Sequence, residues 1–533
     1  MKNKFLLVAG LVCALAAKLP AQQDVIARIH FLGGDTIAAD PAHSAFTNEF
    51  CSAEAKALES QTLGKLSRVA SEWFNSKLPA GATNGVAQLR PLLDDLLKSE
   101  WVFEIRDVTF EMRGVTNGLP EYALAIRLNP DRAQVWSKNL QTVLQNWTGT
   151  GISQDKTGIW TLIKTTPALS FQFSHSGDWV VGDCRPSKLS LRQEIIAPFQ
   201  NSRLSESTWL SADLNWPRLA QFFPSLKEFD FPKIQMQVVG HGTNLQLTGK
   251  LTLAQPLPPL GNWRIPTNEI HQPLVSFTAA RGVAPWLAKQ PWMRPFAIRL
   301  QPDQIFLWAM ARIPFQTFAA EPVPDATAAL AQLYQQLSAE SGLQSLFFDP
   351  VKLTMTKNEI SWDNMPFMMP NIRAAQGPAG DFLVGGFFPN PPKAPPPPPE
   401  LLTPLSRSNL VYYHWEVTAE RLKELPQLSQ TLLVLTRHEQ VQPESAAGKW
   451  LDRIEPALGN ALTEVTQSAP NELAFKRTAG GGLTAIELLA LVDWLEAPKF
   501  PALDLRLPPP RVRPGQKPSN LMTAPTPAAP THP

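Results

Sequence analysis

The chain has 533 residues, a formal net charge of +2 and 44% apolar residues. That length allows roughly two to four domains, and the apolar content excludes a fully disordered chain. The charges are nearly balanced, with 48 Lys and Arg against 46 Asp and Glu, and no concentrated basic stretch marks a nucleic-acid surface. We therefore expect a folded protein with no nucleic-acid partner.

The first residues have the pattern of a secretory signal peptide. Lys2 and Lys4 precede an uncharged apolar stretch at residues 5–17, and small residues follow as far as Ala21. This stretch is shorter than a transmembrane helix requires, and no later segment reaches that length. We expect residues 1–21 to be removed and the mature chain to be exported to the periplasm, cell envelope or extracellular space, without a transmembrane span. Export would leave Cys51 and Cys184, and their spacing does not decide whether they form a disulfide.

Strand-like and helix-like segments alternate along the mature chain, and short turns such as residues 176–178 and 240–244 predict hairpins. Hairpins imply antiparallel strands, so we expect an α+β fold of antiparallel sheets with covering helices. A strand followed directly by a helix recurs, which suggests repeated units. The four predicted pairs are residues 122–128 with 132–147, 208–214 with 217–223, 274–278 with 283–289, and 410–417 with 419–425.

Proline-rich stretches suggest how the chain is divided. The run at residues 389–406 favours an extended linker or loop, and residues 499–533 contain too few apolar side chains for a core, so we expect a disordered tail. With boundaries near residues 120 and 260, the predicted order follows. It is a signal peptide (1–21), an N-terminal helical region with the first strands (22–120), α+β modules (121–260 and 261–388), the proline-rich linker (389–406), a C-terminal α+β module (407–498) and the tail (499–533).

The combination of an export signal, repeated strand-helix units and proline-rich ends resembles large exported bacterial proteins of unknown function. The segments that carry the resemblance most directly are residues 122–126 and 177–182. The resemblance implies an α+β envelope or extracellular protein, and it transfers no catalytic residues.

The densest group of possible metal ligands is His30, Asp35, Asp40 and His43, around a Gly-Gly pair. Imidazole and carboxylate groups suit zinc, manganese or iron, so these four residues are the candidate metal site. The same residues have an ordinary structural interpretation, as a strand, a turn and a helix cap. No cofactor is indicated elsewhere in the sequence.

Three other patterns can also be explained structurally. Ser153 and Lys156 have the spacing of a Ser-Lys nucleophile pair but share one loop, and the glycines at 480–482 could hold an anion or simply reverse the chain. Acids could supply a glycosidase pair, because such a pair leaves little local trace in a sequence. The acids considered were Asp94, Asp95, Glu104 and Asp107.

The leading functional hypothesis is an exported, non-enzymatic scaffold or binding protein, with a protein, a polymer or a lipid-like molecule as its ligand. The alternative is an exported hydrolase that acts on polysaccharide or peptide. The hypotheses differ in whether reactive side chains from distant segments converge in three dimensions.

Overall fold

The structure is a computed structural model. It describes residues 25–75, 86–106, 111–112, 115–116, 120–156, 159–165, 168–185, 195, 208–223, 226, 231–287, 303–311, 316–339, 352–363, 368–388, 395–424, 444–498 and 500–501. The expected signal peptide and nearly all of the expected tail lie outside these residues. Within them, no helix combines the length and the apolar character needed to cross a bilayer.

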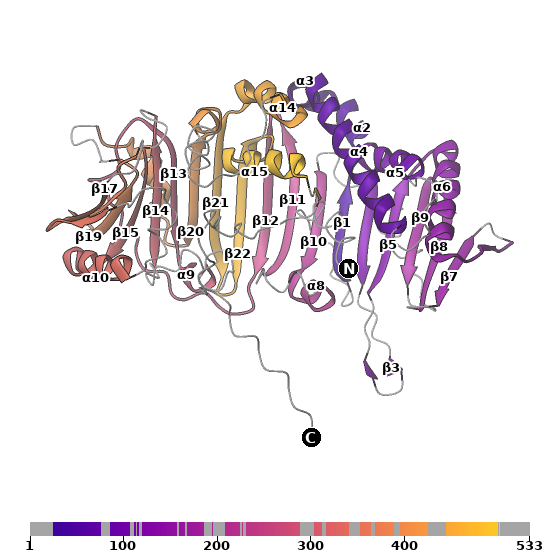
Figure 1. Cartoon of the computed structure of the whole chain (residues 1–533), viewed down its shortest axis with the longest axis horizontal. Helices are drawn as coiled ribbons and strands as arrows, with labels where there is room; N and C mark the ends of the chain where they lie inside the picture. Colours follow the sequence, from indigo (N-terminus) through magenta and orange to yellow (C-terminus); the bar gives the residue numbers. More distant parts are fainter. Residues whose placement is uncertain are drawn as a thin grey trace, which may run out of the picture.

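The strands form one open antiparallel sheet of 20 strands, with a separate small hairpin, β3–β4 (Figure 1). In chain order the strands are β1 (Val25–Phe31), β2 (Trp101–Arg106), β3 (Glu111–Met112), β4 (Val115–Thr116), β5 (Glu121–Arg127), β6 (Ser153–Gln154), β7 (Trp160–Thr165), β8 (Ala168–Ser176), β9 (Trp179–Arg185), β10 (Thr208–Asn215), β11 (Lys233–His241), β12 (Asn244–Thr252), β13 (Leu274–Arg281), β14 (Gln304–Met310), β15 (Thr317–Val323), β16 (Lys352–Met355), β17 (Glu359–Asp363), β18 (Asn371–Gly377), β19 (Gly380–Gly386), β20 (Leu410–Val417), β21 (Asn460–Ala469) and β22 (Glu472–Gly480).

The helices pack mainly on one face of this sheet. The α-helices are α2 (Gly34–Ala39), α3 (Ser44–Phe50), α4 (Ala53–Asn75), α5 (Val86–Lys98), α6 (Pro130–Thr148), α8 (Trp216–Phe222), α9 (Ala284–Leu287), α10 (Ala326–Ala339), α12 (Pro399–Leu402), α14 (Ala446–Ile454) and α15 (Ala485–Glu496), and residues 418–424 are also helical.

The predicted fold class, an α+β fold of antiparallel sheets with covering helices, is wrong, since the described chain forms mostly one large open antiparallel sheet of 20 strands. All modules contribute strands to the same sheet, because strands that are distant in the sequence pair edge to edge, as β1 does with β10, β12 with β22 and β13 with β20. The sheet continues across the expected boundary near Pro120, since β2 and β5 on either side of it are partners. Alternation of apolar and polar residues predicts local hairpins but carries no information about such distant pairings.

The order of the strands shows an internal duplication. From one edge, the pairings run β6–β7–β8–β9–β5–β2–β1–β10–β11–β12, and they continue through β22–β21–β20–β13–β14–β15–β19–β18–β17–β16. Each half has ten strands with the same connections, and the two halves meet where their last strands, β12 and β22, pair. The sheet therefore has a pseudo-twofold arrangement centred on the β12–β22 ladder.

This duplication explains the recurrent strand-helix pattern. Each of the four predicted pairs is present, as β5–α6, β10–α8, β13–α9 and β20 with helical residues 418–424. Only β10 and β20 are counterparts in the two halves. The counterpart of β13 is β1, which leads into α2, and the counterpart of β5 is β15, which leads into α10.

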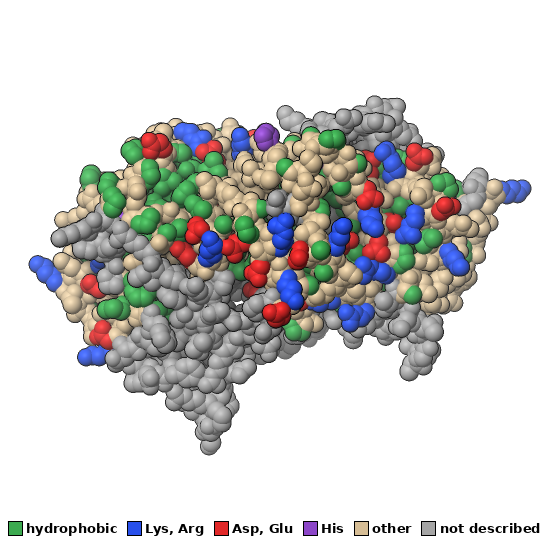
Figure 2. Space-filling model, turned by 90° about the horizontal axis from the view of Figure 1, so that it is seen from above, with side chains coloured by type: hydrophobic (Ala, Val, Ile, Leu, Met, Phe, Trp, Pro, Cys, Tyr) green, Lys and Arg blue, Asp and Glu red, His purple; other side chains and the backbone are tan. Residues whose placement is uncertain are grey.

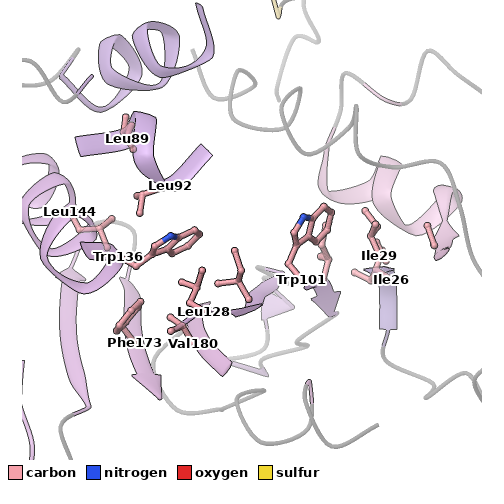
Figure 3. Packing of buried hydrophobic residues seen from close by; sticks show 14 of the residues in the cluster. Ile26, Ile29, Leu89, Leu92, Trp101, Leu128, Trp136, Leu144, Phe173 and Val180 are labelled. Carbon is pink, nitrogen blue, oxygen red and sulfur yellow. The ribbon is translucent and has the colours of Figure 1, made fainter. Parts of the chain in front are cut away.

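We call the side of the sheet that carries α4–α6, α8, α10, α14 and α15 the helix face. In the first half, its core joins α5 and α6 to the strands through interlocking large side chains (Figure 3). Leu89 and Leu92 of α5 and Trp136 and Leu144 of α6 pack with strand residues such as Phe173. Burial of these apolar side chains stabilises the first half of the sheet.

The opposite side, the loop face, is partly covered in both halves by short helical turns and loops. In the second half, buried strand residues including Phe277, Phe306 and Trp308 pack against Trp263, Ile265 and Ile270 and against Leu401, Leu402 and Leu405. The last three belong to the proline-rich segment expected to be a linker or loop. Its described part lies on the sheet, and the carbonyl groups of Pro395 and Pro396 accept hydrogen bonds from Gln272. In the first half, Ile195 packs on Val102 and Val181.

Candidate functional site

The structure does not bring the four candidate metal ligands into one site. Among the described residues, no three His, Cys, Asp or Glu side chains are placed to hold a metal ion. His30 is buried in β1, with its Nε2 2.9 Å from Oε1 of Glu100. Asp35 is exposed in the first turn of α2. These two residues therefore have separate surroundings.

The other two candidates meet at a helix start. Asp40 accepts a hydrogen bond from the backbone of Ala42 (2.8 Å), and its second oxygen lies 3.4 Å from Nδ1 of His43. His43 is buried against Trp209, whose indole Nε1 lies 3.3 Å from His43 Nε2 and donates to it. The capping interpretation of Asp40 is thus the one that the geometry supports.

The acids considered as a glycosidase pair are used in ion pairs. Asp95, which was expected on a solvated helix face, is buried and binds Arg132 and Trp136. Glu104 is fully buried between Arg28 and Arg106. Asp94 pairs with Arg90 one helical turn away, and Asp107 lies outside the described residues. These contacts hold elements together.

Two further patterns from the sequence also have structural roles. Ser153 lies in β6 and donates to the carbonyl of Thr161 in β7. Gly481 and Gly482 have positive φ angles of 64° and 79°, which place α15 against the end of β22. The first backbone donors of α15 already have carboxylate acceptors, since Glu487 binds the Thr484 amide and Glu416 binds the Ala485 amide. The chain itself therefore supplies the anion at this helix start. Cys51 and Cys184 are both free thiols.

The loop face has a different character at the centre of the sheet, between its two covered ends. Here most outward residues of β11, β12, β22 and β21 are polar, with Leu462 (37% exposed) as an apolar exception, whereas the covered regions present large apolar side chains. We call these side chains the central strip. They are Gln235, Gln237, Gln246, Thr248, Lys250, Lys476, Thr478, Glu464 and Thr466. All are at least partly exposed, so the strip is accessible on this side of the sheet.

The pairing register of the four strands places the side chains of the central strip in rows. Gln237 pairs with Thr248, Thr248 with Lys476, and Lys476 with Glu464, so these four side chains form a row across four strands. Adjacent rows differ by two residues along each strand, and neighbouring strands lie about 4.7–4.9 Å apart. The result is a grid of amide, hydroxyl and charged groups that spans the pseudo-twofold centre.

Two of the three charges of the strip are paired with residues beside it. Lys250 donates to Glu472 (2.8 Å), and Glu464 binds Arg407, whereas Lys476 is only opposite Glu464 in the strand register. By contrast, no hydrogen bond joins the side chains of Gln237 or Gln246 to any other residue in the described ranges. Their amide groups are thus available to a ligand, as donors and acceptors without net charge.

The sequence contains part of this signal. The segments at 233–239 and 244–250 alternate apolar residues with Gln, Thr and Lys, which is typical of a strand with one solvated face. The alternation does not reveal that β12 lies beside β22, and that pairing is what makes the polar faces continuous.

Surface charge elsewhere is mixed. Seen from above, Lys and Arg are interspersed with Asp and Glu over the visible described surface, without a patch of one sign (Figure 2).

Comparisons of the chain with protein-family models, curated proteins and solved structures found no match. The role of the central strip is therefore inferred from the chemistry of its side chains.

Proposed function

We propose that the protein is an exported envelope or secreted scaffold that binds an uncharged, hydroxyl-rich polymer, such as a polysaccharide, on the central strip. The observation that carries the proposal is the group of partly exposed Gln and Thr side chains on the central strip, with the amides of Gln237 and Gln246 unbonded among the described residues. A neutral polymer suits this surface because its hydroxyls can both donate to and accept from Gln and Thr, and the strip carries few charges, two of which are already paired. Export remains a proposal that rests on the N-terminal sequence pattern.

The test is binding of the full mature chain to a panel of neutral and charged polysaccharides by isothermal titration calorimetry and affinity electrophoresis. We expect a neutral polysaccharide to bind, with an affinity that changes little between low and high salt. Replacing Gln237 and Gln246 together by Ala removes two sets of hydrogen bonds. At about 0.5–1.5 kcal/mol each, their loss weakens binding by roughly tenfold.

The matched control is Gln376→Ala, an exposed glutamine of β18 outside the strip. It should leave the affinity unchanged. Failure of every neutral polysaccharide to bind, or equal affinity of the double variant and the control, would contradict the proposal. A strongly salt-dependent preference for a charged polymer would contradict it as well.

A further inference from the structure

The helix face of the two halves differs at one pair of equivalent strands. In the first half, β1 and β10 present apolar residues to the helices, among them Ala27, Ile29, Ala212 and Leu214, each no more than 1% exposed. The counterparts of these strands, β13 and β20, pair in the same antiparallel way. There the residues on this face include Ser276, Thr278, His414 and Glu416.

Burial of these polar groups lowers the stability of the fold, which suggests that they have a role other than packing. Glu416 and Ser276 are buried, and the side chain of His414 is only 13% exposed. Moving polar groups out of water lowers stability unless hydrogen bonds compensate, and the first half shows that the same position can be filled by apolar residues. The polar set is therefore a candidate for chemistry.

Three of these side chains lie in sequence. Oγ1 of Thr278 lies 2.8 Å from Nδ1 of His414. Nε2 of His414 lies 3.4 Å from Oε2 of Glu416, within ion-pair distance but without the geometry of a hydrogen bond. The other carboxylate oxygen, Oε1, accepts from the Ala485 amide (2.7 Å) and from Oγ1 of Thr418 (3.0 Å). These two bonds fix the position of Glu416.

The order of the contacts determines what each group can do. A carboxylate beside Nε2 favours the imidazole tautomer with its proton on Nε2, so Nδ1 keeps its lone pair and accepts the hydroxyl proton of Thr278. A hydroxyl within hydrogen-bond distance of a base, with the base oriented by a third group, is the arrangement of an activated nucleophile.

We propose that Thr278, His414 and Glu416 form a catalytic centre that hydrolyses carboxylic esters, with Thr278 as nucleophile, His414 as general base and Glu416 as the positioning residue. Leu307 is opposite Thr278 on β14 and is 42% exposed, so it offers an apolar contact for the acyl group. This activity goes beyond the proposed binding function and uses none of the residues of the central strip. It differs from the hydrolase expected from the sequence in both residues and substrate.

In the first step, Oγ of Thr278 attacks the ester carbonyl carbon, and its proton moves to Nδ1 of His414. The tetrahedral intermediate collapses, the bond to the leaving alcohol breaks, and the alcohol takes the proton from His414. Water then attacks the acyl-threonine and gives a proton to Nδ1. The carboxylic acid is released, and Thr278 recovers its proton from His414. The negative charge of Glu416 stabilises the imidazolium in both steps.

The experiment uses the full mature chain with p-nitrophenyl acetate and with a fluorophosphonate probe, followed by peptide mass spectrometry. We expect ester hydrolysis and a single phosphonylated residue, Thr278, with loss of fluoride. Thr278→Ala should abolish labelling, Thr278→Ser should retain it, and His414→Gln should lower kcat by about 100-fold or more. The matched control is Thr354→Ala, at the sheet edge, where the hydroxyl contacts Asp363 without an imidazole (2.9 Å).

A positioning role for Glu416 has its own readout. Glu416→Gln should lower kcat with little change in KM and should alter the pH dependence of kcat, whereas a purely structural role would change the melting temperature and leave kcat per folded molecule constant. Thermal unfolding of each variant identifies those that fold. The proposal is overturned if the wild-type protein neither hydrolyses the ester nor reacts with the probe, if the label is on another residue, or if folded Thr278→Ala retains wild-type activity.

Discussion

The buried carboxylate of Asp95 allows a quantitative test of how the first half is held together. Its oxygens accept hydrogen bonds from Arg132 Nη2 (2.8 Å) and Trp136 Nε1 (2.8 Å), which joins α5 to α6. In Asp95→Ala, the indole N–H of Trp136, in a side chain that is 4% exposed, loses its acceptor at a cost of about 1–3 kcal/mol. Arg132 is 36% exposed and can turn to water, so its share is at most about 1 kcal/mol. The expected loss is therefore about 1–4 kcal/mol.

Urea denaturation followed by circular dichroism measures this difference, with an unchanged slope in urea as a check on the unfolding transition. Asp94→Ala is the neighbouring control, because its pair with Arg90 is about one-third exposed on both sides and contributes only about 0.3–0.5 kcal/mol. A double-mutant cycle of Asp95→Ala with Trp136→Phe should show a clear coupling energy. Equal stabilities of the Asp95→Ala and Asp94→Ala variants would refute the assigned role of Asp95.

Three further predictions concern other parts of the sheet. Gly249→Ala should lower the free energy of unfolding by about 1–3 kcal/mol, because a Cβ on this β12 residue would lie 2.1 Å from the Gln235 carbonyl oxygen. Gly182→Ala is the control: a Cβ there has no atom within 4 Å, so it should cost far less in the same urea assay. Burial raises the pKa of Glu321 from 4.5 to about 7, so the native state retains its proton longer than the unfolded state and loses stability as the pH rises between these values. Glu321→Gln should therefore be more stable than the wild-type protein at pH 8, by at most about 3 kcal/mol, and equally stable below pH 4.5. The same stability difference at both pH values would contradict this prediction. Cys51 is exposed, whereas burial, with Asp183 and Glu121 nearby, raises the pKa of Cys184 to about 12. A maleimide at neutral pH should therefore label Cys51 first. Rapid labelling of Cys184 in the native protein would contradict this expectation.

Local features of this fold could be predicted from the sequence, but its overall plan could not. The hairpin of β11 and β12 was visible as two alternating segments around Gly242, which has a φ of 60°. The same alternation is compatible with several small sheets, and nothing local distinguishes them from one continuous sheet. The sequence predicts strand-helix repetition. Its cause is a duplicated half of ten strands, and this half depends on pairings such as β5–β9 and β15–β19, whose strands are separated in the chain by a helix and further strands.

The proposed sites were hidden for the same reason. His30, Asp35, Asp40 and His43 are close in sequence, but a strand and two helix starts separate His30 and Asp35 from each other and from the contact between Asp40 and His43. Thr278 and His414 are far apart in the sequence and become neighbours only through the β13–β20 register. Active and binding sites often combine distant segments, so a search for short motifs does not find them.

The junction between β12 and β22 also has a consequence for biosynthesis. Asn244–Thr252 leaves the ribosome long before Glu472–Gly480, its partner in the ladder. Until the C-terminal strand arrives, nine residues of β12 have an unpaired row of amide and carbonyl groups on that side. A nascent chain in this state can add the β12 of another copy in place of its own β22. Completion of this junction is therefore a step at which we expect pairing between copies to compete with folding.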